Sequence, residues 1–208
     1  MRHSKHSCAR AAAALAVLAA TACSGATHEA AAQDVAPPAR RPHTAADVSF
    51  MSGMIVHHTQ AVVIAGWAPS HGASPAVQRL CERIVVGQQD EIAILRRWLV
   101  DRGEPVPTAD SSDHAMHHPP DMPGMLSPEE LAQLDSARGP AFDRLFLTLM
   151  IAHHRGALVM VDGLLAAQGA GQDETVFRIA SDVHADQSTE IRRMQQMLAA
   201  LPPEGQGP

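Results

Sequence analysis

Apolar residues recur at steps of three and four along four long segments of this 208-residue chain, and that spacing marks one face of an α-helix. The first segment follows the capping sequence Thr44-Ala45-Ala46-Asp47, and the second follows Ser74-Pro75, where proline suits the first helical turn. A short helix from Ser127 to about Ala137 precedes the third long segment, which runs from roughly Pro140 to Ala167. The fourth closes at Pro202, and no strand pattern competes, so the sequence predicts an all-α fold.

The second half of the chain repeats the first. Met54–Ala61 returns as Met150–Ala157 with a His-His pair at its centre both times, and Gln88–Ile92 returns as Gln187–Ile191. Each half is therefore a helical hairpin with one apolar face, which is not stable by itself. Packing the two hairpins together predicts a four-helix bundle with pseudo-twofold symmetry.

The first residues predict export from the cytoplasm. Arg2, Lys5 and Arg10 precede the apolar run Ala11–Ala20, which is too short to span a bilayer but suits a signal-peptide core. Ala20-Thr21-Ala22-Cys23 resembles a bacterial lipoprotein processing box, so we expect a lipid anchor on Cys23 and a place in the cell envelope, in the periplasm or on the outer face of the membrane. Ordinary cleavage near Ala22 or Ala32, giving a soluble exported protein, is the alternative.

These patterns divide the chain into five parts. We expect a signal peptide at 1–22, a tether at 23–43, a bundle at 44–201 (hairpin 44–103, linker 104–126, hairpin 127–201) and a tail at 202–208. The formal charge of −6 becomes more negative once the basic first segment is removed, which disfavours nucleic acid as a partner. Cys81 would then be the one remaining thiol besides Cys23, so no disulfide framework is expected, and Cys81 is interpreted as a small core residue.

The His pairs are the strongest candidates for chemistry. Their helical spacing places Met54 beside His57 and His58, and Met150 beside His153 and His154. We expect His57 and His153 to face the interior, with His58 and His154 at its edge. Imidazole binds several transition metals, and thioether sulfur favours Cu(I), so copper is the predicted ligand and zinc an alternative. The competing interpretation is a structural histidine layer held by hydrogen bonds, or one that senses pH.

Polar residues on the second helix of each hairpin interrupt otherwise apolar faces. These residues, Gln88, Glu91, Gln187 and Glu190, could accept the second ring N–H of a metal-binding histidine, act as carboxylate ligands, or form a polar layer that sets helix register. A di-iron carboxylate enzyme would need Glu-x-x-His motifs on two helices, and the sequence contains none. Because no other catalytic motif occurs, we expect a protein without enzymatic activity.

The linker is a second candidate for metal capture, because short His-rich tracts with interleaved methionine favour copper. His184, near the inner face of the last helix, is expected to join the bundle site, whereas Met160 and Met194 are interpreted first as core residues and second as ligands. His28, His43 and His71 are expected to be solvated. The candidate ligands of the linker are His114, Met116, His117, His118, Met122 and Met125.

The doubled motif is similar to that of the bacterial DUF305 family, over roughly Thr44–Leu201. The resemblance rests on Asp47–His58, on Phe142–Ala157 and on the tail of each hairpin. It implies a ferritin-like four-helix fold, secretion or lipid anchoring, no established enzymatic activity and, in some members, copper binding and copper tolerance. The family's Met and His-His fall on Met54, His57, His58, Met150, His153 and His154. Two further family methionines stand here as Met160 and Met194, but as Ile64 and Leu95 in the first hairpin, which is therefore poorer in sulfur.

We therefore expect an exported, membrane-tethered bundle that binds copper, as Cu(I), and either sequesters it or transfers it to a copper-handling protein. The alternative is a non-enzymatic interaction module or pH sensor whose histidine layer is structural.

Overall fold

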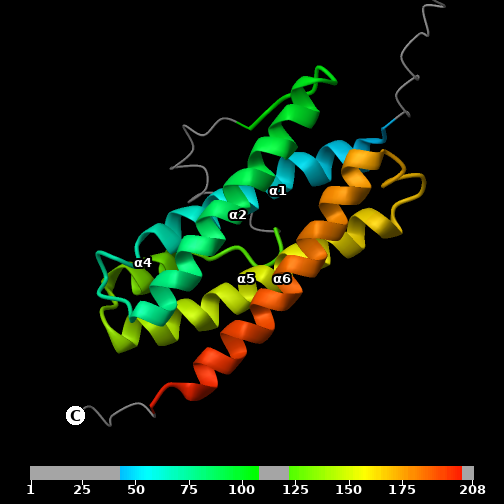
Figure 1. Ribbon diagram of the computed structural model, residues 1–208. Helices are drawn as coiled ribbons and strands as arrows, with labels where there is room; N and C mark the ends of the chain where they lie inside the picture. The colour runs from blue at the N-terminus through cyan, green and yellow to red at the C-terminus, as the bar shows by residue number, and fades with distance from the viewer. Residues whose placement is uncertain (1–42, 108–121, 203–208) are drawn as a thin grey trace, which may run out of the picture. The chain divides into compact units, whose positions relative to one another are not determined.

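A computed structural model describes residues 43–107 and 122–202 of the protein, which form five helices and no strand (Figure 1). The all-helical prediction is confirmed. The predicted signal peptide, the tether with Cys23, the tail beyond 202 and the linker residues His114, Met116, His117 and His118 lie outside the described residues. The helices are α1 (Ala45–Gly66), α2 (Pro75–Val100), α4 (Pro128–Ser136), α5 (Pro140–Ala166) and α6 (Glu174–Ala200).

The helix starts follow the capping signals in the sequence. The Thr44 hydroxyl accepts a hydrogen bond from the backbone N–H of Asp47, whose carboxylate caps back onto Thr44, and Ser127 and Glu130 form the same capping box on α4. Ser74 caps α2 ahead of a proline in its first turn. These caps fix where α1, α2 and α4 begin, and on α1 and α2 they thereby set the level at which the polar residues enter the bundle.

The two hairpins are α1–α2 and α5–α6, and they meet mainly through α1 and α5 (Figure 1). The two meeting helices are the most apolar of the four, each with a window of mean hydropathy 1.3, long and apolar enough by length and composition to cross a membrane. About half of that window is buried inside the bundle in each case. Their apolar character follows from contact with more than one neighbouring helix.

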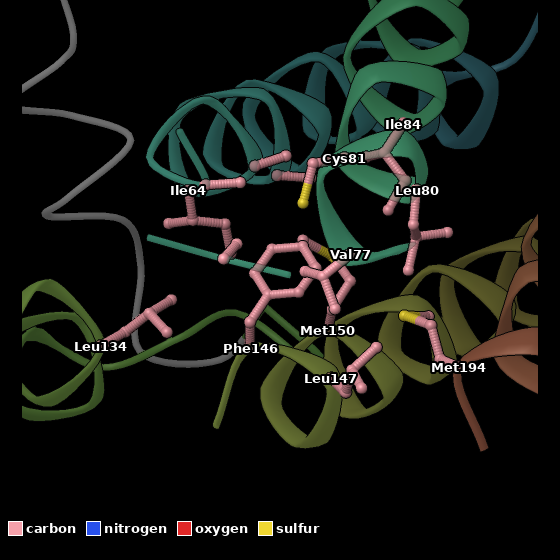
Figure 2. Close-up of a cluster of buried hydrophobic side chains, with 14 of the residues drawn as sticks. Ile64, Val77, Leu80, Cys81, Ile84, Leu134, Phe146, Leu147, Met150 and Met194 are labelled. Carbon is pink, nitrogen blue, oxygen red and sulfur yellow. The ribbon is translucent and has the colours of Figure 1, made fainter. Parts of the chain in front are cut away.

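A polar layer divides the apolar core into two clusters. One cluster includes Ile64, Leu80, Phe146, Met150 and Met194 (Figure 2), and the other includes Phe50, Met54, Leu95, Val161 and Val183. Between them, at the middle of all four long helices, lie the buried polar residues His57, His58, Gln88, His153, His154 and Gln187. The repeat therefore places its polar residues at one level of the bundle.

The two hairpins hold each other through equivalent aspartates. The Asp47 carboxylate at the start of α1 accepts a 2.7 Å hydrogen bond from the backbone N–H of Gly171, in the loop of the second hairpin. Asp143 at the start of α5 accepts the backbone N–H of Ser74, in the loop of the first hairpin, at 3.1 and 3.2 Å. Both carboxylates are buried, so each hairpin satisfies a backbone donor of the other.

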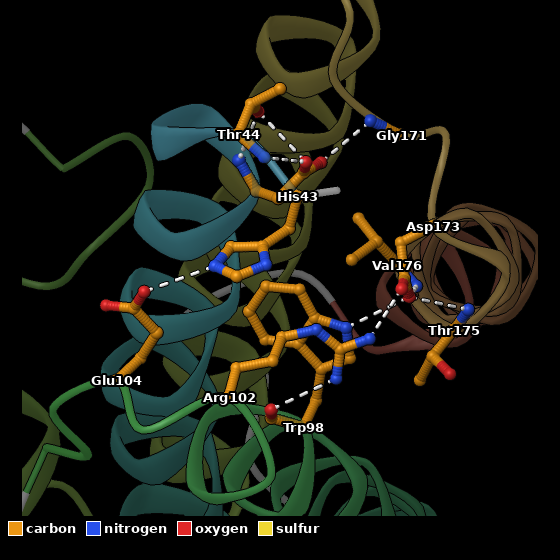
Figure 3. A network of polar contacts seen from close by, with 10 residues as sticks. His43, Thr44, Trp98, Arg102, Glu104, Gly171, Asp173, Thr175 and Val176 are labelled. Atoms are coloured by element: carbon orange, nitrogen blue, oxygen red, sulfur yellow. Dashed lines mark hydrogen bonds and ion pairs between the residues drawn. The ribbon is translucent and has the colours of Figure 1, made fainter. Parts of the chain in front are cut away.

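A polar network joins the end of α2 to the start of α6 (Figure 3). The Asp173 carboxylate accepts hydrogen bonds from Trp98 Nε1 at 3.0 Å and from the Arg102 guanidinium at 2.5 Å. Burial alone would raise the pKa of Asp173, but the hydrogen bonds from Trp98, the Val176 amide and Arg102, with the Arg102 charge, hold that pKa below its ordinary value. The ionised carboxylate also caps α6, so one side chain ties the two helices together.

Two histidines predicted to be solvated have partners in this fold. His43 is partly exposed, bonds Glu104 at 3.1 Å and packs edge-on against Trp98 (Figure 3). His71 is buried at 5 % exposure, so the prediction for it was wrong. Its ring lies parallel to Trp67 and hydrogen-bonds the Asp135 carbonyl, because the loop after α1 folds against the end of α4.

Candidate metal centre: a buried histidine layer

Four imidazoles meet at the centre of the bundle, and none of them is exposed to solvent. His57 and His58 come from α1, and His153 and His154 from α5, all at 0 % exposure. The predicted edge position of His58 and His154 was wrong, because α2 and α6 cover them completely. The rings of His57 and His153 lie 3.9 Å apart between centroids with their planes 41° apart, so the two repeats meet at these side chains.

The second histidine of each pair is held by a glutamate of the neighbouring helix in its own hairpin. Nε2 of His58 lies 2.6 Å from Oε2 of Glu91 on α2, and Nε2 of His154 lies 2.7 Å from Oε2 of Glu190 on α6. A carboxylate only accepts hydrogen bonds, so Nε2 carries the proton in both rings. The Nδ1 atoms of these two rings are buried and have no hydrogen-bond partner among the described residues. In the neutral ring Nδ1 therefore presents a lone pair, the form in which imidazole binds a metal.

His153 is the most isolated of the four. Neither of its ring nitrogens has a hydrogen-bond partner within residues 43–107 and 122–202. Burial, reinforced by the neighbouring imidazoles of His57, His154 and His58, lowers the pKa of His153 well below its ordinary value of 6.5, and a weaker interaction with the His57 backbone opposes this shift without reversing it. The ring is therefore neutral at physiological pH, with one nitrogen available as a metal ligand.

A short stretch of the linker closes over the layer. This closing segment, Met122–Leu126, accepts a 3.1 Å hydrogen bond from His57 Nε2 at the Pro123 carbonyl. Gln60 on α1 holds it with two hydrogen bonds to the backbone of Leu126, at 2.9 and 3.2 Å. On α5, Gly156 lets the segment touch the helix backbone, since a Cβ there would overlap the Pro123 carbonyl. Gly124 packs against Gly156 with a φ of +76°, which glycine adopts readily.

The candidate sulfur ligands surround the layer unevenly. Met54 and Met150 are fully buried and lie on opposite sides of it, each in a different apolar cluster. Met160 and Met122 are partly buried, and both methyl groups approach Gly53, one turn before His57. Met194 is buried in the cluster that holds Met150 (Figure 2), and Met125 is partly buried in the closing segment.

Two other candidates lie apart from the layer. His184 is exposed although its neighbour Val183 is buried, so the expectation that it joins the bundle site was wrong. Cys81 is a buried free thiol in the apolar core, as expected (Figure 2). Burial, with the nearby charge of Asp143, raises the pKa of Cys81 to about 12, so the thiol stays protonated and is a poor metal ligand.

Gln88 and Gln187 occupy the same level as the histidines but do not bond to them. Both are buried, at 4 % and 2 % exposure, and neither amide has a hydrogen-bond partner among the described residues. The glutamates, and not the glutamines, are thus the hydrogen-bond partners of His58 and His154. The sequence analysis missed Gln60 and Gly156. A signal was available, because the two residues occupy the same position of the two repeats, yet one has a long polar side chain and the other has none.

The layer gathers donors without converging them on one point. No group of three or more His, Cys, Asp or Glu side chains in the described part of the chain is arranged to hold a metal ion. Bound in this layer, an ion would need small ring rotations, or sulfur atoms, to complete its coordination.

The fold and site together define a class: a bundle of two repeated hairpins with a buried histidine layer at their junction. The model of the DUF305 family, described as a domain of unknown function, matches residues 47–198, and the chain belongs to this family.

Solved structures with the same fold include other members of the family. A DUF305 fragment from Deinococcus radiodurans is 31 % identical, with a TM-score of 0.65 over 77 % of this chain and 99 % of that one. A candidate secreted DUF305 protein from Streptomyces coelicolor is 30 % identical, with a TM-score of 0.63 over 74 % and 92 %. CopM in its Cu(II)-bound form is 28 % identical, with a TM-score of 0.61 over 74 % and 95 %, and CopM has also been solved with Cu(I) and with silver.

A curated relative matches a smaller part of the chain. The uncharacterised protein L153 of Acanthamoeba polyphaga mimivirus is 30 % identical over 56 residues. The match covers 27 % of this chain and 37 % of that protein, so the chain spans little more than a third of the length of this relative.

Proposed function

We propose that this protein binds copper ions at the buried histidine layer and sequesters or transfers them in the cell envelope, without enzymatic activity. The observation that carries the proposal is the set of buried imidazole nitrogens on His58, His153 and His154 that have no hydrogen-bond partner among the described residues. Leaving a buried polar atom unpartnered costs about 1–3 kcal/mol. A bound ion would offset that cost, whereas a purely structural layer would not.

Copper fits the donors better than a hard cation does. The layer offers neutral imidazoles, and Met54 and Met150 add thioether sulfur, which favours Cu(I). Glu91 and Glu190 would hold Nε2–H of His58 and His154 and so keep Nδ1 directed at the ion. His57 and His153 would supply the remaining nitrogen donors. The copper and silver forms of CopM support this choice of metal by similarity. Zinc is the alternative ion.

We extend the proposal to the cell location. The predicted signal peptide would export the chain, and lipid attachment at Cys23 would tether the bundle to the membrane, within reach of a copper-handling partner protein. Metabolic labelling with a radioactive fatty acid tests the anchor: the unsubstituted protein is expected to be labelled, and a Cys23→Ser variant is not. Equal labelling of both would remove the anchor from the proposal.

The copper proposal is tested by anaerobic competition for Cu(I) with a chromophoric chelator. The full chain carries Cys8→Ser and Cys23→Ser, so that the thiols of the first segment do not bind the ion. His153→Leu removes the imidazole whose two nitrogens have no hydrogen-bond partner in the described part of the chain, and it is expected to weaken binding by at least about tenfold, or about 1.4 kcal/mol. A parallel titration with Zn(II) distinguishes the two metals.

Two matched variants control for the loss of a histidine as such. His71→Leu removes another buried imidazole outside the layer, and His184→Ala removes an exposed one. Both are expected to bind Cu(I) like the parent chain. If His153→Leu also binds like the parent, the histidine layer is structural and the proposal is wrong. Deleting residues 114–118 tests the linker separately, because loss of tight binding with that deletion alone would move the site out of the bundle.

A further inference from the structure

A cavity of about 210 Å³ lies between α2 and α6, directly beside the histidine layer. Its walls come from different hairpins, with Gly87, Gln88 and Glu91 on α2 and Asp186, Gln187 and Glu190 on α6. The four histidines have no exposed surface, so an ion needs an opening such as this cavity, or a movement of the helices, to reach them.

The cavity is acidic at its mouth. Asp186 is exposed, and the carboxylates of Glu91 and Glu190 line the same cavity. Partial burial and then the charges of Glu91, Glu190 and Asp182 raise the pKa of Asp186, which indicates that these acids act on one another. Arg83 is the one basic side chain among the lining residues, and it is exposed. Clustered carboxylates raise the local concentration of cations.

The floor of the cavity carries polar groups that nothing in the described chain satisfies. Gln88 and Gln187 line it from equivalent positions of the two repeats, and both are more than nine-tenths buried. All four amide N and O atoms lack a hydrogen-bond partner within the described residues. Amide oxygen is a ligand for cations, and the two amides stand between the acidic mouth and the bundle interior.

The glutamates connect this cavity to the imidazoles. Glu91 and Glu190 line the cavity, keep 15 % and 22 % of their side chains exposed, and accept hydrogen bonds from fully buried His58 and His154. Each carboxylate is therefore accessible on one side and bonded to the layer on the other. On the side of His57, the described chain covers the layer with Pro123 and with the backbone contact of Gly124 with Gly156.

We propose that the cavity between α2 and α6 is the entrance of the histidine layer, where a copper ion docks on carboxylate and amide oxygens before passing to His58 and His154. This inference rests on the proposed copper function. It assigns Asp186, Gln88 and Gln187 to the docking of the ion, and it gives Glu91 and Glu190 a second task beside holding the imidazoles.

The test separates the rate of loading from the affinity. The full chain is mixed anaerobically with Cu(I), the ion used in the affinity test, and free ion is trapped after set delays with a chromophoric chelator. Gly87→Leu is the main variant, since a Cβ at Gly87 meets nothing within 4 Å and the side chain would extend into the cavity. We expect loading and release both to slow by at least about tenfold, with the equilibrium affinity unchanged. Gly163→Leu is the matched control, a helical glycine of α5 with equally open surroundings.

A charge variant tests the mouth of the cavity. Asp186→Asn is expected to slow loading several-fold at low ionic strength, and the difference is expected to shrink as salt is added. Asp162→Asn removes the same charge from an exposed site on α5 and is expected to load like the parent.

If Gly87→Leu binds copper at the parental affinity and the parental rate, the ion enters elsewhere. The proposed entrance is then wrong, and the proposed copper binding is unaffected. If the parent chain itself binds no copper, the proposed function fails and the entrance fails with it.

Discussion

Gln60 and Gly156 occupy the same position of the two repeats and hold the same closing segment by opposite means. Gln60 reaches out with a side-chain amide that bonds the Leu126 backbone twice, whereas Gly156 has no side chain and lets the segment touch the helix. One segment contacts both hairpins, so the two equivalent positions cannot carry the same residue. Gln60 in the first repeat makes the hydrogen bonds, and Gly156 in the second leaves room for the backbone of the segment.

Gly156→Ala is the direct test of this arrangement. Its methyl group would overlap the Pro123 carbonyl, so the backbone of the closing segment or of α5 would have to shift. We expect a loss of about 1–3 kcal/mol in the free energy of unfolding, as for other overpacked sites. Urea denaturation of the metal-free protein measures it. The control is Gly163→Ala on the same helix, which has open surroundings and should gain up to about 1 kcal/mol from helix propensity.

His153→Leu should make the metal-free protein more stable. The substitution replaces a fully buried ring, with both nitrogens unpartnered among the described residues, by an apolar side chain. We expect a gain of about 1–3 kcal/mol in denaturant unfolding. His71→Leu should have the opposite sign, because His71 is buried with hydrogen bonds to Trp67 and Asp135 that would be lost. A loss of stability in both variants would mean that His153 has partners in solution.

The metal-free protein should lose stability in mild acid. The folded-state pKa of His153 lies well below 6.5, so below that pH the unfolded chain binds a proton that the folded chain does not. Stability is therefore fully present above pH 6.5 and falls as the pH drops towards the folded-state pKa. Unfolding free energies between about pH 8 and about pH 5, with a chelator present, measure this slope. His153→Leu should flatten it, and an equal slope in the variant would contradict the assignment.

Asp143→Ala should weaken the contact between the hairpins. The buried carboxylate accepts the Ser74 N–H, and its removal leaves that donor without its partner. We expect a loss of about 1–3 kcal/mol in unfolding free energy. Asp143→Asn keeps one acceptor oxygen and should lose less, and Asp162→Ala, an exposed aspartate of the same helix, should be close to neutral. A loss in Asp162→Ala as large as in Asp143→Ala would argue for a general charge effect on α5.

The helices and their inner faces could be predicted from the sequence because both depend on residues that are close together in the chain. Spacing alone placed Phe50, Met54, His57 and Ile64 on one buried face of α1, and the caps at Thr44 and Ser74 marked the helix starts. The depth of His58 could not be obtained this way. It lies one residue from His57 and so turns towards α2, and its burial depends on how closely that helix packs.

The position of the closing segment could not be predicted from local sequence patterns either. Its position depends on contacts of Leu126 with Gln60 and of Gly124 with Gly156, and the first pair is 66 residues apart. Nothing in the linker itself indicates where its end docks. The prediction for His184 was wrong for a local reason. Its neighbour Val183 is buried, but one residue further along the helix the side chain turns away from the core, so His184 is exposed.

The exchanged contacts of Asp47 and Asp143 bear on how binding depends on protein concentration. Each hairpin completes the other, so two separate copies of one hairpin could form the same bundle, with the histidine layer on the dyad between them. Loading such a dimer would depend on its assembly, and a dilute protein would release its ion as the copies came apart. Covalent fusion of the two hairpins makes their encounter intramolecular. The affinity of the layer for the proposed ion would then be a property of one chain, and it would stay constant at any concentration of the protein.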